Sequence, residues 1–226
     1  MKNEELLVLV GDGEFAEIAY EYFTFDSPFK VVAFAVEKEY IKKETLFDLP
    51  IIPFEEIEQR YPPDQYKVFV AINSTQLNRP RTRLFNLVKN KGYKVVSYIS
   101  SKAFVWRNVS IGENTFIFEN NVLQHYVVVG NNVIIWSGNH IGHRSVIKDN
   151  TFISSHVVIA GRSEIGESCF LGVNSTFNGN IKIGKDCFIS SGAVVNKDTR
   201  EGLIYSGNPA KSNKITSYRY YGIEAE

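Results

Sequence analysis

A six-residue period governs the hydrophobic positions of segment 105–200. Starting at Val105, every sixth residue is aliphatic or aromatic through sixteen successive hexads, with no change of phase. The chain is only 44% apolar overall, so composition alone does not produce such a run. An α-helix repeats about every 3.6 residues and a strand every two, so neither explains a period of six. The positions are Val105, Ile111, Ile117, Leu123, Val129, Ile135, Ile141, Ile147, Ile153, Ile159, Ile165, Leu171, Phe177, Ile183, Ile189 and Val195.

A second column, four residues after the first, is also restricted. It holds mostly small or β-branched residues, for example Thr115, Ser145 and Ala193. We therefore expect each hexad to form a short flat face, with one large side chain filling the interior and a small one near the corner. Three hexads make a triangular turn, and successive turns stack as parallel strands about 4.8 Å apart. The segment is predicted to be a solenoid in which each turn is buried against its neighbours.

The first hundred residues follow a different pattern. Apolar runs at 6–10, 30–36, 67–72 and 93–99 predict buried strands. Amphipathic segments at 14–23, 54–60 and 79–91 predict helices, while 40–53 reads mostly as loop with a short extended piece at 50–53. Strands and helices that alternate at this spacing predict a small doubly wound parallel sheet.

Two glycines stand where such a sheet can hold a phosphate. Gly11-Asp12-Gly13 follows the first predicted strand and opens the first predicted helix. The motif departs from the full dinucleotide fingerprint, because its third glycine is Ala16 and an acid lies inside it. A structural turn without a ligand is the alternative.

Composition narrows the class of protein. The 226 residues suit one large or two small domains, and the net charge of zero gives no electrostatic footprint for nucleic acid. The N-terminal residues carry acids before a short apolar run, which indicates a strand and not a signal peptide. No apolar run approaches a membrane span, so we expect a cytoplasmic protein.

Cys169 and Cys187 share one column, which predicts two small core residues without a disulfide.

The combination of the two patterns resembles a known family. A short Rossmann-like domain (1–102), a left-handed parallel β-helix (103–211) and a C-terminal tail (212–226) are similar to the bacterial sugar O- and N-acyltransferases of the hexapeptide-repeat superfamily. That family includes sialic-acid O-acetyltransferase-like proteins and N-acetyltransferases of nucleotide-linked amino sugars. Tyr205-Ser206-Gly207-Asn208-Pro209-Ala210-Lys211 looks like the G-x-P-A-K segment that closes the coil there. The left hand of the coil and a homotrimer with active sites between subunits are implied by the resemblance. No metal is expected, because the acyl donor of such a reaction is already activated.

The histidines suggest where the chemistry lies. At a spacing of three hexads, one column contains His125, His143, Gly161 and Gly179, so imidazoles sit next to bare backbone on an outer edge. Acyl transfer from a thioester needs a base, and histidine has the pKa nearest to working pH. The segment Asn139-His140-Ile141-Gly142-His143-Arg144 matches the catalytic segment of the sugar N-acetyltransferases.

The resemblance assigns roles to particular residues. His143 is the catalytic base. His156, Gly161, Gly179 and Lys211 are implied to bind the acyl-CoA. The nucleotide-sugar is implied to lie on Gly11, Asp12, Gly13, Glu37 and Asn73, and the acceptor sugar on Trp136 and His125.

Three positions depart from the family pattern. The residue after His143 is Arg144 where the N-acetyltransferases usually have an acid, so either Asp149 or Glu164 takes that role or the base is less polarised. Trp136 replaces a common asparagine, and the acidic pair after the second strand is reduced to Glu37.

The sequence thus predicts an acetyl-CoA-dependent N-acetyltransferase that acts on a nucleotide-linked 4-amino or 3-amino dideoxy sugar for a surface glycan such as O-antigen. An O-acetyltransferase, or transfer of another acyl group, is the nearest alternative. A zinc carbonic anhydrase-like site would need two histidines five residues apart, whereas His140 and His143 are three apart. A non-catalytic solenoid that binds sugar nucleotides is a further alternative. Apart from these alternatives, His125 and His140 can be structural or supporting residues, His156 an ordinary edge residue, and Trp106 and Trp136 packing residues at a subunit contact.

Overall fold

The computed structural model describes residues 5–224, which form two compact units. The first unit comprises the chain up to Asn73 together with Pro80–Tyr98, and the second comprises Ser74–Arg79 with the chain from Ile99 onward. Residues 1–4 of the predicted first domain and 225–226 of the predicted tail lie outside the described residues. The sequence pattern did not anticipate that the short segment Ser74–Arg79 would group with the coil.

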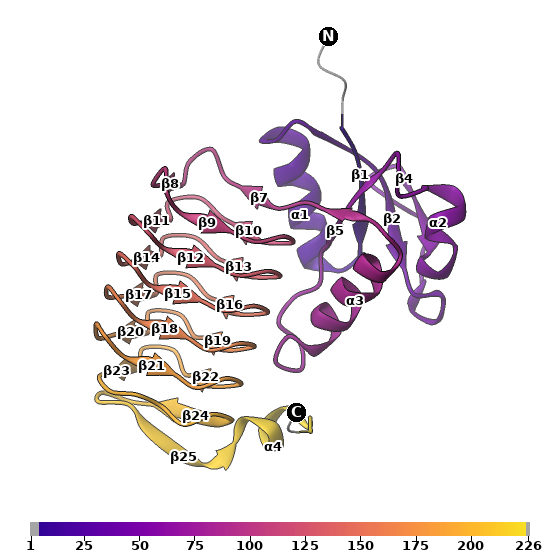
Figure 1. The fold of residues 1–226 in the computed structure, drawn as a ribbon. Helices are drawn as coiled ribbons and strands as arrows, with labels where there is room; N and C mark the ends of the chain where they lie inside the picture. Colours follow the sequence, from indigo (N-terminus) through magenta and orange to yellow (C-terminus); the bar gives the residue numbers. More distant parts are fainter. Residues whose placement is uncertain (1–4, 225–226) are drawn as a thin grey trace. The chain divides into compact units, whose positions relative to one another are not determined.

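The first unit contains a six-stranded sheet in the order β3-β4-β2-β1-β5-β6. All pairings are parallel except the β3–β4 hairpin. Helix α1 and helix α2 lie on opposite sides of this sheet (Figure 1). The strands are β1 Glu5–Val10, β2 Phe29–Val36, β3 Thr45–Leu46, β4 Leu49–Pro53, β5 Lys67–Val70 and β6 Lys94–Val95, and the helices are α1 Glu14–Phe25, η1 Lys38–Tyr40, η2 Phe54–Glu56, α2 Ile57–Arg60 and α3 Arg79–Asn90.

The hydrophobic runs predicted β1, β2 and β5 of this sheet correctly, while two segments differ from the prediction. The run 93–99, predicted as a single strand, is two strands in two different sheets: β6 completes the first sheet, and β7 (Tyr98–Ile99) is the first strand of a coil sheet. The chain must leave one sheet to join the other here, so a continuous apolar run does not guarantee a continuous strand. The segment 40–53 also contains more structure than expected, since β3 and β4 form a short hairpin.

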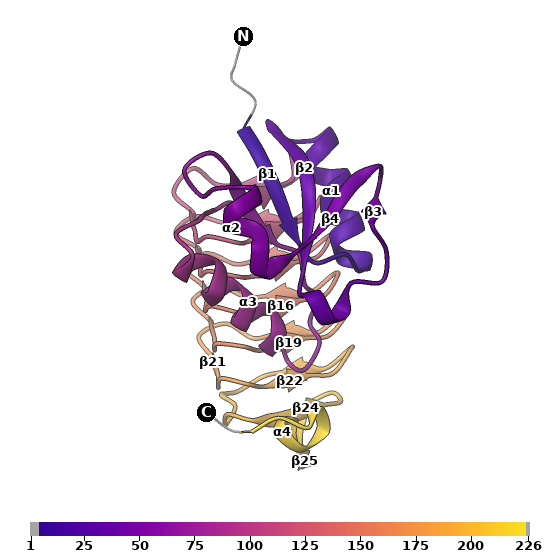
Figure 2. The same cartoon turned by 90° about the vertical axis from the view of Figure 1, so that its right-hand side faces the viewer.

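The second unit is a parallel β-helix with three sheets. Their orders are β25-β24-β22-β19-β16-β13-β10-β7, β23-β20-β17-β14-β11-β8 and β21-β18-β15-β12-β9, here called sheets C, D and E. Figure 2 shows β16, β19 and β22 of sheet C stacked one above the next. The two-residue strands are β8 Phe104–Val105, β9 Ser110–Ile111, β10 Phe116–Ile117, β11 Val122–Leu123, β12 Val128–Val129, β13 Ile134–Ile135, β14 His140–Ile141, β15 Val146–Ile147, β16 Phe152–Ile153, β17 Val158–Ile159, β18 Glu164–Ile165, β19 Phe170–Leu171, β20 Thr176–Phe177, β21 Lys182–Ile183, β22 Phe188–Ile189 and β23 Val194–Val195.

The register confirms the predicted stacking at three hexads. Leu123 pairs with Ile141, Ile141 with Ile159, and Ile159 with Phe177. The large column is buried from Ile117 to Val195, and the small column beside it is also buried. Cys169 and Cys187 are free thiols in that column, as predicted.

The corners from Asn114 to Gly192 each use one residue in the left-handed region. The third residue after each large interior position has a positive φ, from Asn114 (52°) through Arg144 (57°) and His156 (58°) to Asp186 (57°). Asparagine and glycine tolerate this conformation best, and Asn occupies many of these corners. Asparagine enrichment three residues after each large position is therefore a signal of the turn geometry.

The coil ends in a folded cap. Strand β24 (Leu203–Ser206) adds to sheet C, β25 (Lys211–Thr216) runs antiparallel to it, and α4 (Ser217–Tyr221) follows. The predicted C-terminal tail thus contains both an extended strand and a short helix. Asp186 anchors it, because its backbone oxygen accepts a hydrogen bond from Ser217 Oγ at 2.6 Å and its carboxylate accepts one from Tyr218 Oη at 3.2 Å.

Candidate functional site

His143 lies at the corner between sheets D and E, immediately after β14. Its backbone N–H donates to Gln124 Oε1 at 2.9 Å, and its ring is stacked on that of His125 with centroids 5.4 Å apart and planes 13° apart. The ring also covers Gly161, since a Cβ added to Gly161 would lie 2.5 Å from His143 Cε1. The predicted column is therefore a physical one: His125, His143 and Gly161 stack on successive turns.

Beyond His143 the same column contains two glycines and then reaches a cluster of basic side chains. Phe177 pairs with Val195, so Lys197 follows Gly179 in the column after His125, His143 and Gly161. Lys197 lines a pocket of about 470 Å³ together with Arg200 and the predicted acyl-CoA residue Lys211. The complete lining is Lys197, Asp198, Arg200, Tyr205, Ala210, Lys211 and Ser212. Lys197 and Arg200 are not among the residues predicted from the sequence, although one further step of the column reaches Lys197.

Neither of the two acids considered as partners of His143 contacts it. Asp149 accepts hydrogen bonds from the backbone and side chain of Asn131, at 2.8 and 3.2 Å, on the corner between sheets E and C. Glu164 forms an ion pair with Lys148 at 2.5 Å. Arg144 places its guanidinium over the Tyr126 ring, 4.7 Å from the centroid. Within residues 5–224 the imidazole of His143 therefore has no carboxylate partner.

His156 and Trp136 lie on a different edge. His156 follows β16 at the corner between sheets C and D, and its ring covers Gly138 as His143 covers Gly161. Trp136 directly follows β13 of sheet C, and its ring stacks on that of Phe118 with centroids 4.5 Å apart and planes 10° apart. A single chain therefore does not bring either residue together with His143, and their roles toward acetyl and sugar stay predictions.

The predicted nucleotide residues gather at the carboxyl edge of the first sheet. Gly11 has a φ of 115°, and a Cβ there would lie 2.9 Å from Ala71 O, so only glycine fits. Gly13 is the N-cap of α1 and is exposed, and Asp12 lies between the two glycines. Glu37 follows β2, and Asn73 lies exposed beyond β5. Because β1, β2 and β5 are parallel, the structure brings these five residues to one edge.

The arginines of the cluster 79–83 have three different environments. Arg79 forms an ion pair with Asp186 at 2.8 Å within the coil unit. Arg81 is completely buried and donates to Asn73 O at 3.1 Å, and burial lowers its pKa to about 9. Arg83 forms two 2.7 Å hydrogen bonds to the two carboxylate oxygens of Glu37. Their charge alone does not reveal that Arg79 is partly buried, Arg81 fully buried and Arg83 exposed.

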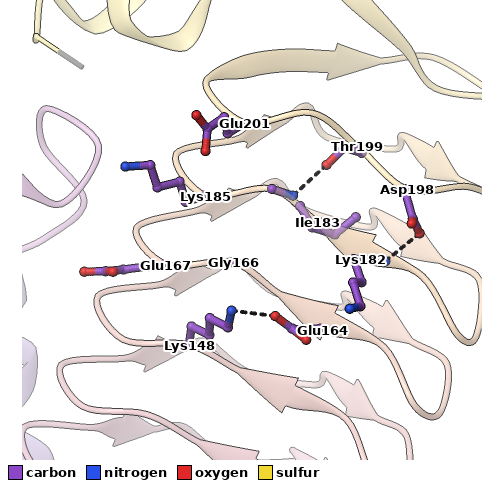
Figure 3. A pocket seen from close by; sticks show the side chains of 11 residues that line it. Lys148, Glu164, Gly166, Glu167, Lys182, Ile183, Lys185, Asp198, Thr199 and Glu201 are labelled. Carbon is purple, nitrogen blue, oxygen red and sulfur yellow. Dashed lines mark hydrogen bonds and ion pairs between the residues drawn. The ribbon is translucent and has the colours of Figure 1, made fainter. Parts of the chain in front are cut away.

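A second groove, of about 400 Å³, lies over sheet E (Figure 3). Lys148 and Glu164 of its lining form an ion pair, and the carboxylate of Asp198 accepts a hydrogen bond from the backbone N–H of Lys182. It contains no histidine.

In the described part of the chain, no group of three His, Cys, Asp or Glu side chains is arranged to hold a metal ion, and no helix is long and apolar enough to cross a membrane.

A family model matches most of the coil. The model described as Bacterial transferase hexapeptide (six repeats) matches residues 108–143, 126–161 and 162–197. The three matches together span residues 108–197, which lie within the segment of six-residue period. His125, His143, Gly161 and Gly179 all lie within it.

Solved structures resemble the hexapeptide-repeat coil together with the first unit. The acetyltransferase domain of PglB from Neisseria gonorrhoeae in complex with acetyl coenzyme A has a TM-score of 0.83 and 21% identity, covering 93% of this chain and 100% of that one. PerB from Caulobacter crescentus in complex with CoA and GDP-perosamine has a TM-score of 0.82 and 23% identity, covering 92% and 96%. WeeI from Acinetobacter baumannii has a TM-score of 0.61 and 19% identity, covering 92% and 100%.

At this level of identity the likeness establishes the fold. The predicted architecture, a Rossmann-like domain followed by a left-handed β-helix, is confirmed. The curated protein sequences include no significant match to this chain.

Proposed function

We propose that the protein is an acetyl-CoA-dependent N-acetyltransferase that acts on a nucleotide-linked amino sugar, with His143 as the general base. One observation carries the proposal: His143 lies on an edge whose next two column positions are glycines and whose end is a cluster of cations. The fold likeness to the PglB acetyltransferase domain and to PerB supports it.

The coil edge suits an extended acyl-CoA. Three turns separate His143 from Lys197, which is about 14 Å at the spacing of stacked parallel strands. The pantetheine arm, in this proposal, crosses Gly161 and Gly179, and the phosphates lie near Lys197, Arg200 and Lys211. Cations that converge on one pocket suit phosphate groups, because their attraction is concentrated there.

The chemistry needs only the donor, the acceptor amine and one base. The amine nitrogen attacks the thioester carbonyl, a C–N bond forms, and His143 takes the proton that the nitrogen loses. The tetrahedral intermediate then collapses, the C–S bond breaks, and the proton passes from His143 to the CoA sulfur. Positioning of the two substrates supplies much of the rate, since the thioester is already activated.

Recognition of the nucleotide is assigned to the first unit. Gly11, Asp12 and Gly13 place a backbone turn at the N-terminus of α1, where N–H groups favour a diphosphate. Glu37 and Asn73 lie at the same edge of the sheet. The acceptor is a nucleotide-linked 4-amino or 3-amino dideoxy sugar used for a surface glycan, and the cytoplasm, where such donors are made, is the expected location.

We also propose that the active form is a homotrimer. His143 and His156 lie on different edges of one coil, so a site that uses both requires a second copy. Sheet D, which joins these edges, has apolar outward residues, of which Phe104 and Val158 are 54% and 41% exposed. A parallel arrangement of three coils would cover that face and bring the two edges together.

The alternatives predict different acceptors or none. An O-acetyltransferase would use the same histidine on a hydroxyl, and a non-catalytic solenoid would bind nucleotide without turnover.

The test is acetyl transfer from acetyl-CoA to a panel of UDP-, dTDP- and GDP-linked amino sugars, measured by release of free thiol. We expect one sugar to react, and His143→Ala to lower kcat by roughly 10²-fold or more because a positioned base contributes about that much. His140→Ala, which lies on β14 three residues before His143, is the matched control and should retain most activity. Turnover that survives His143→Ala would place the base elsewhere, and a hydroxyl-only acceptor would favour the O-acetyltransferase.

A further inference from the structure

Glu37 lies at the edge of the first sheet where a doubly wound fold binds a nucleoside. It directly follows β2, and β1 and β2 run parallel with Val10 paired to Ala35, so Glu37 and the Gly11 turn share one edge. Gly11 N–H donates to Ala35 O at 2.8 Å, which fixes the two loops together. In doubly wound folds a carboxylate at the end of the second strand accepts hydrogen bonds from ribose hydroxyls.

Arg83 holds this carboxylate in one orientation. Its Nη1 donates to Oε1 and its Nη2 to Oε2, both at 2.7 Å, so the two groups meet as planar forks. The hydrogen bonds from Arg83 lower the pKa of Glu37, which keeps it ionised. A flexible surface glutamate thus becomes a fixed acceptor.

The paired carboxylate still has capacity for a ligand. An ionised carboxylate offers about four acceptor sites, of which Arg83 uses two. The Glu37 side chain is 20% exposed and that of Arg83 51%, so the remaining lone pairs can be reached from solvent. Arg83 also offsets the negative charge that would otherwise repel a diphosphate bound at the Gly11 turn.

We propose that Glu37, oriented by Arg83, accepts a hydrogen bond from the 2′-hydroxyl of the substrate's ribose, and that the protein therefore selects ribonucleotide-linked sugars over 2′-deoxyribonucleotide-linked ones. This inference deepens the proposed function and rests on its nucleotide site. Glu37 is the residue that reads the hydroxyl, and Arg83 is a positioning residue that acts through it. The substrate class narrows to sugars carried on a ribonucleoside diphosphate, such as UDP or GDP, and excludes dTDP.

The experiment compares nucleotide pairs that differ only in the 2′-oxygen. Affinities of the full-length protein for UDP and dUDP, and for GDP and dGDP, are measured by titration calorimetry. For the base that binds better, we expect the deoxy form to bind at least about 10-fold more weakly, since a hydrogen bond to a charged group is worth that much. Equal affinity for both members of each pair would overturn the proposal.

Variants distinguish a loss of 2′-hydroxyl recognition from a general loss of stability. Glu37→Gln should reduce the preference to about 3-fold or less, because it loses the charge and the paired orientation. Arg83→Lys should keep the affinity for the deoxy form, since the positive charge remains, but lose most of the 2′-preference, since lysine cannot form the fork. Glu56→Gln, which breaks the exposed Arg60–Glu56 pair in the same unit, is the matched control and should leave the preference unchanged.

The outcomes distinguish this proposal from the function on which it rests. A Glu37→Gln variant that retains the full preference would assign the reading to another residue and overturn the inference. Absence of binding by any nucleotide would remove the nucleotide site and the inference with it. Binding with a 2′-preference but no acetyl transfer would overturn the proposed reaction and leave the inference standing.

Discussion

At the residue scale, His143 is positioned by packing and by its backbone rather than by a carboxylate. Gln124 Oε1 accepts a hydrogen bond from the His143 N–H, and the His125 ring stacks on the imidazole. The imidazole also packs against the backbone of Gly161 on the next turn. Asp149 and Glu164, the acids nearest in sequence, are bound to other partners. The direction of the imidazole therefore depends on the shape of the column, and glycine at position 161 is part of that shape.

Gly161→Ala should lower activity through His143. A Cβ at 161 would lie 2.5 Å from His143 Cε1 and 2.7 Å from Nδ1, so the ring must move away from its place. We expect kcat for acetyl transfer to fall by about 10- to 100-fold, because misplacement of a base by about 1 Å is enough for such a loss. Nucleotide affinity, measured by calorimetry, should not change, since its site is in the other unit.

A double variant identifies the cause. The overpacking should cost about 1–2 kcal/mol of unfolding free energy with His143 present and much less in the His143→Ala background, where the ring is absent. Equal costs in both backgrounds, measured by denaturant unfolding, would mean that the added methyl clashes with something other than the imidazole.

The sequence could predict which residues share a column but not how their side chains meet. A strict period fixes the stacking of His125, His143 and Gly161 because each turn repeats the one before it. No period relates Glu37 to Arg83, which are 46 residues apart and meet through the tertiary fold. For the same reason the sequence does not distinguish the fully buried Arg81 from the partly buried Arg79 and the exposed Arg83.

At the element scale, Asp186 joins three segments of the coil unit. Its carboxylate pairs with Arg79 from the segment Ser74–Arg79 and accepts from Tyr218 of α4, while it occupies a left-handed corner. Burial and the neighbouring Asp186 raise the pKa of Tyr218 to about 12, so its hydroxyl stays protonated and can donate. Asn78 adds a hydrogen bond to Cys169 O at 3.3 Å.

Asp186→Asn should loosen this junction without breaking the corner. Asparagine tolerates the φ of 57° and can still accept from Tyr218, so the change removes mainly the charge that balances Arg79. The side chains of Arg79 and Asp186 are 17% and 3% exposed. We expect a loss of about 2 kcal/mol in unfolding free energy, less than for a completely buried pair because Arg79 reaches solvent.

Denaturant unfolding and proteolysis of α4 measure the effect. Glu164→Gln is the control on the same coil, since it removes the more exposed Lys148–Glu164 pair and should cost less than about 1 kcal/mol. A similar loss in both variants would show that the position of Asp186 at the junction adds nothing to an ordinary surface pair.

Elements whose hydrophobic residues recur at a fixed spacing could be predicted from the sequence. Segments whose place depends on tertiary contacts could not. The coil, the first sheet and its helices follow from hydrophobic spacing. The segment Ser74–Arg79 has no period, and three successive residues in it, Gln76, Leu77 and Asn78, have positive φ. Its place in the coil unit depends on Arg79 and Asn78 finding partners more than ninety residues away.

At the scale of the whole molecule, the decisive feature is that the two candidate histidines occupy different edges of one coil. His143 lies between sheets D and E, and His156 between sheets C and D. In the proposed trimer, each active site would take His143 from one subunit and His156 from its neighbour. The period that places both residues says nothing of a second chain, so only an assembly experiment tests this.

Mixing two inactive variants provides that experiment. His143→Ala and His156→Ala subunits, co-expressed in equal amounts, should assemble into mixed trimers. If a site draws one histidine from each of two subunits, about a quarter of the sites in randomly mixed trimers carry both intact histidines, and activity should rise to about that fraction of wild type. If both histidines of a site come from the same subunit, no mixed trimer contains an intact site, and activity stays at the level of the separate variants. The double variant His143→Ala/His156→Ala, co-expressed with either single variant, is the control, since it can restore no site in either arrangement. Should His156→Ala alone retain wild-type kcat and KM, His156 is no part of the site, and its place at the corner between sheets C and D is structural.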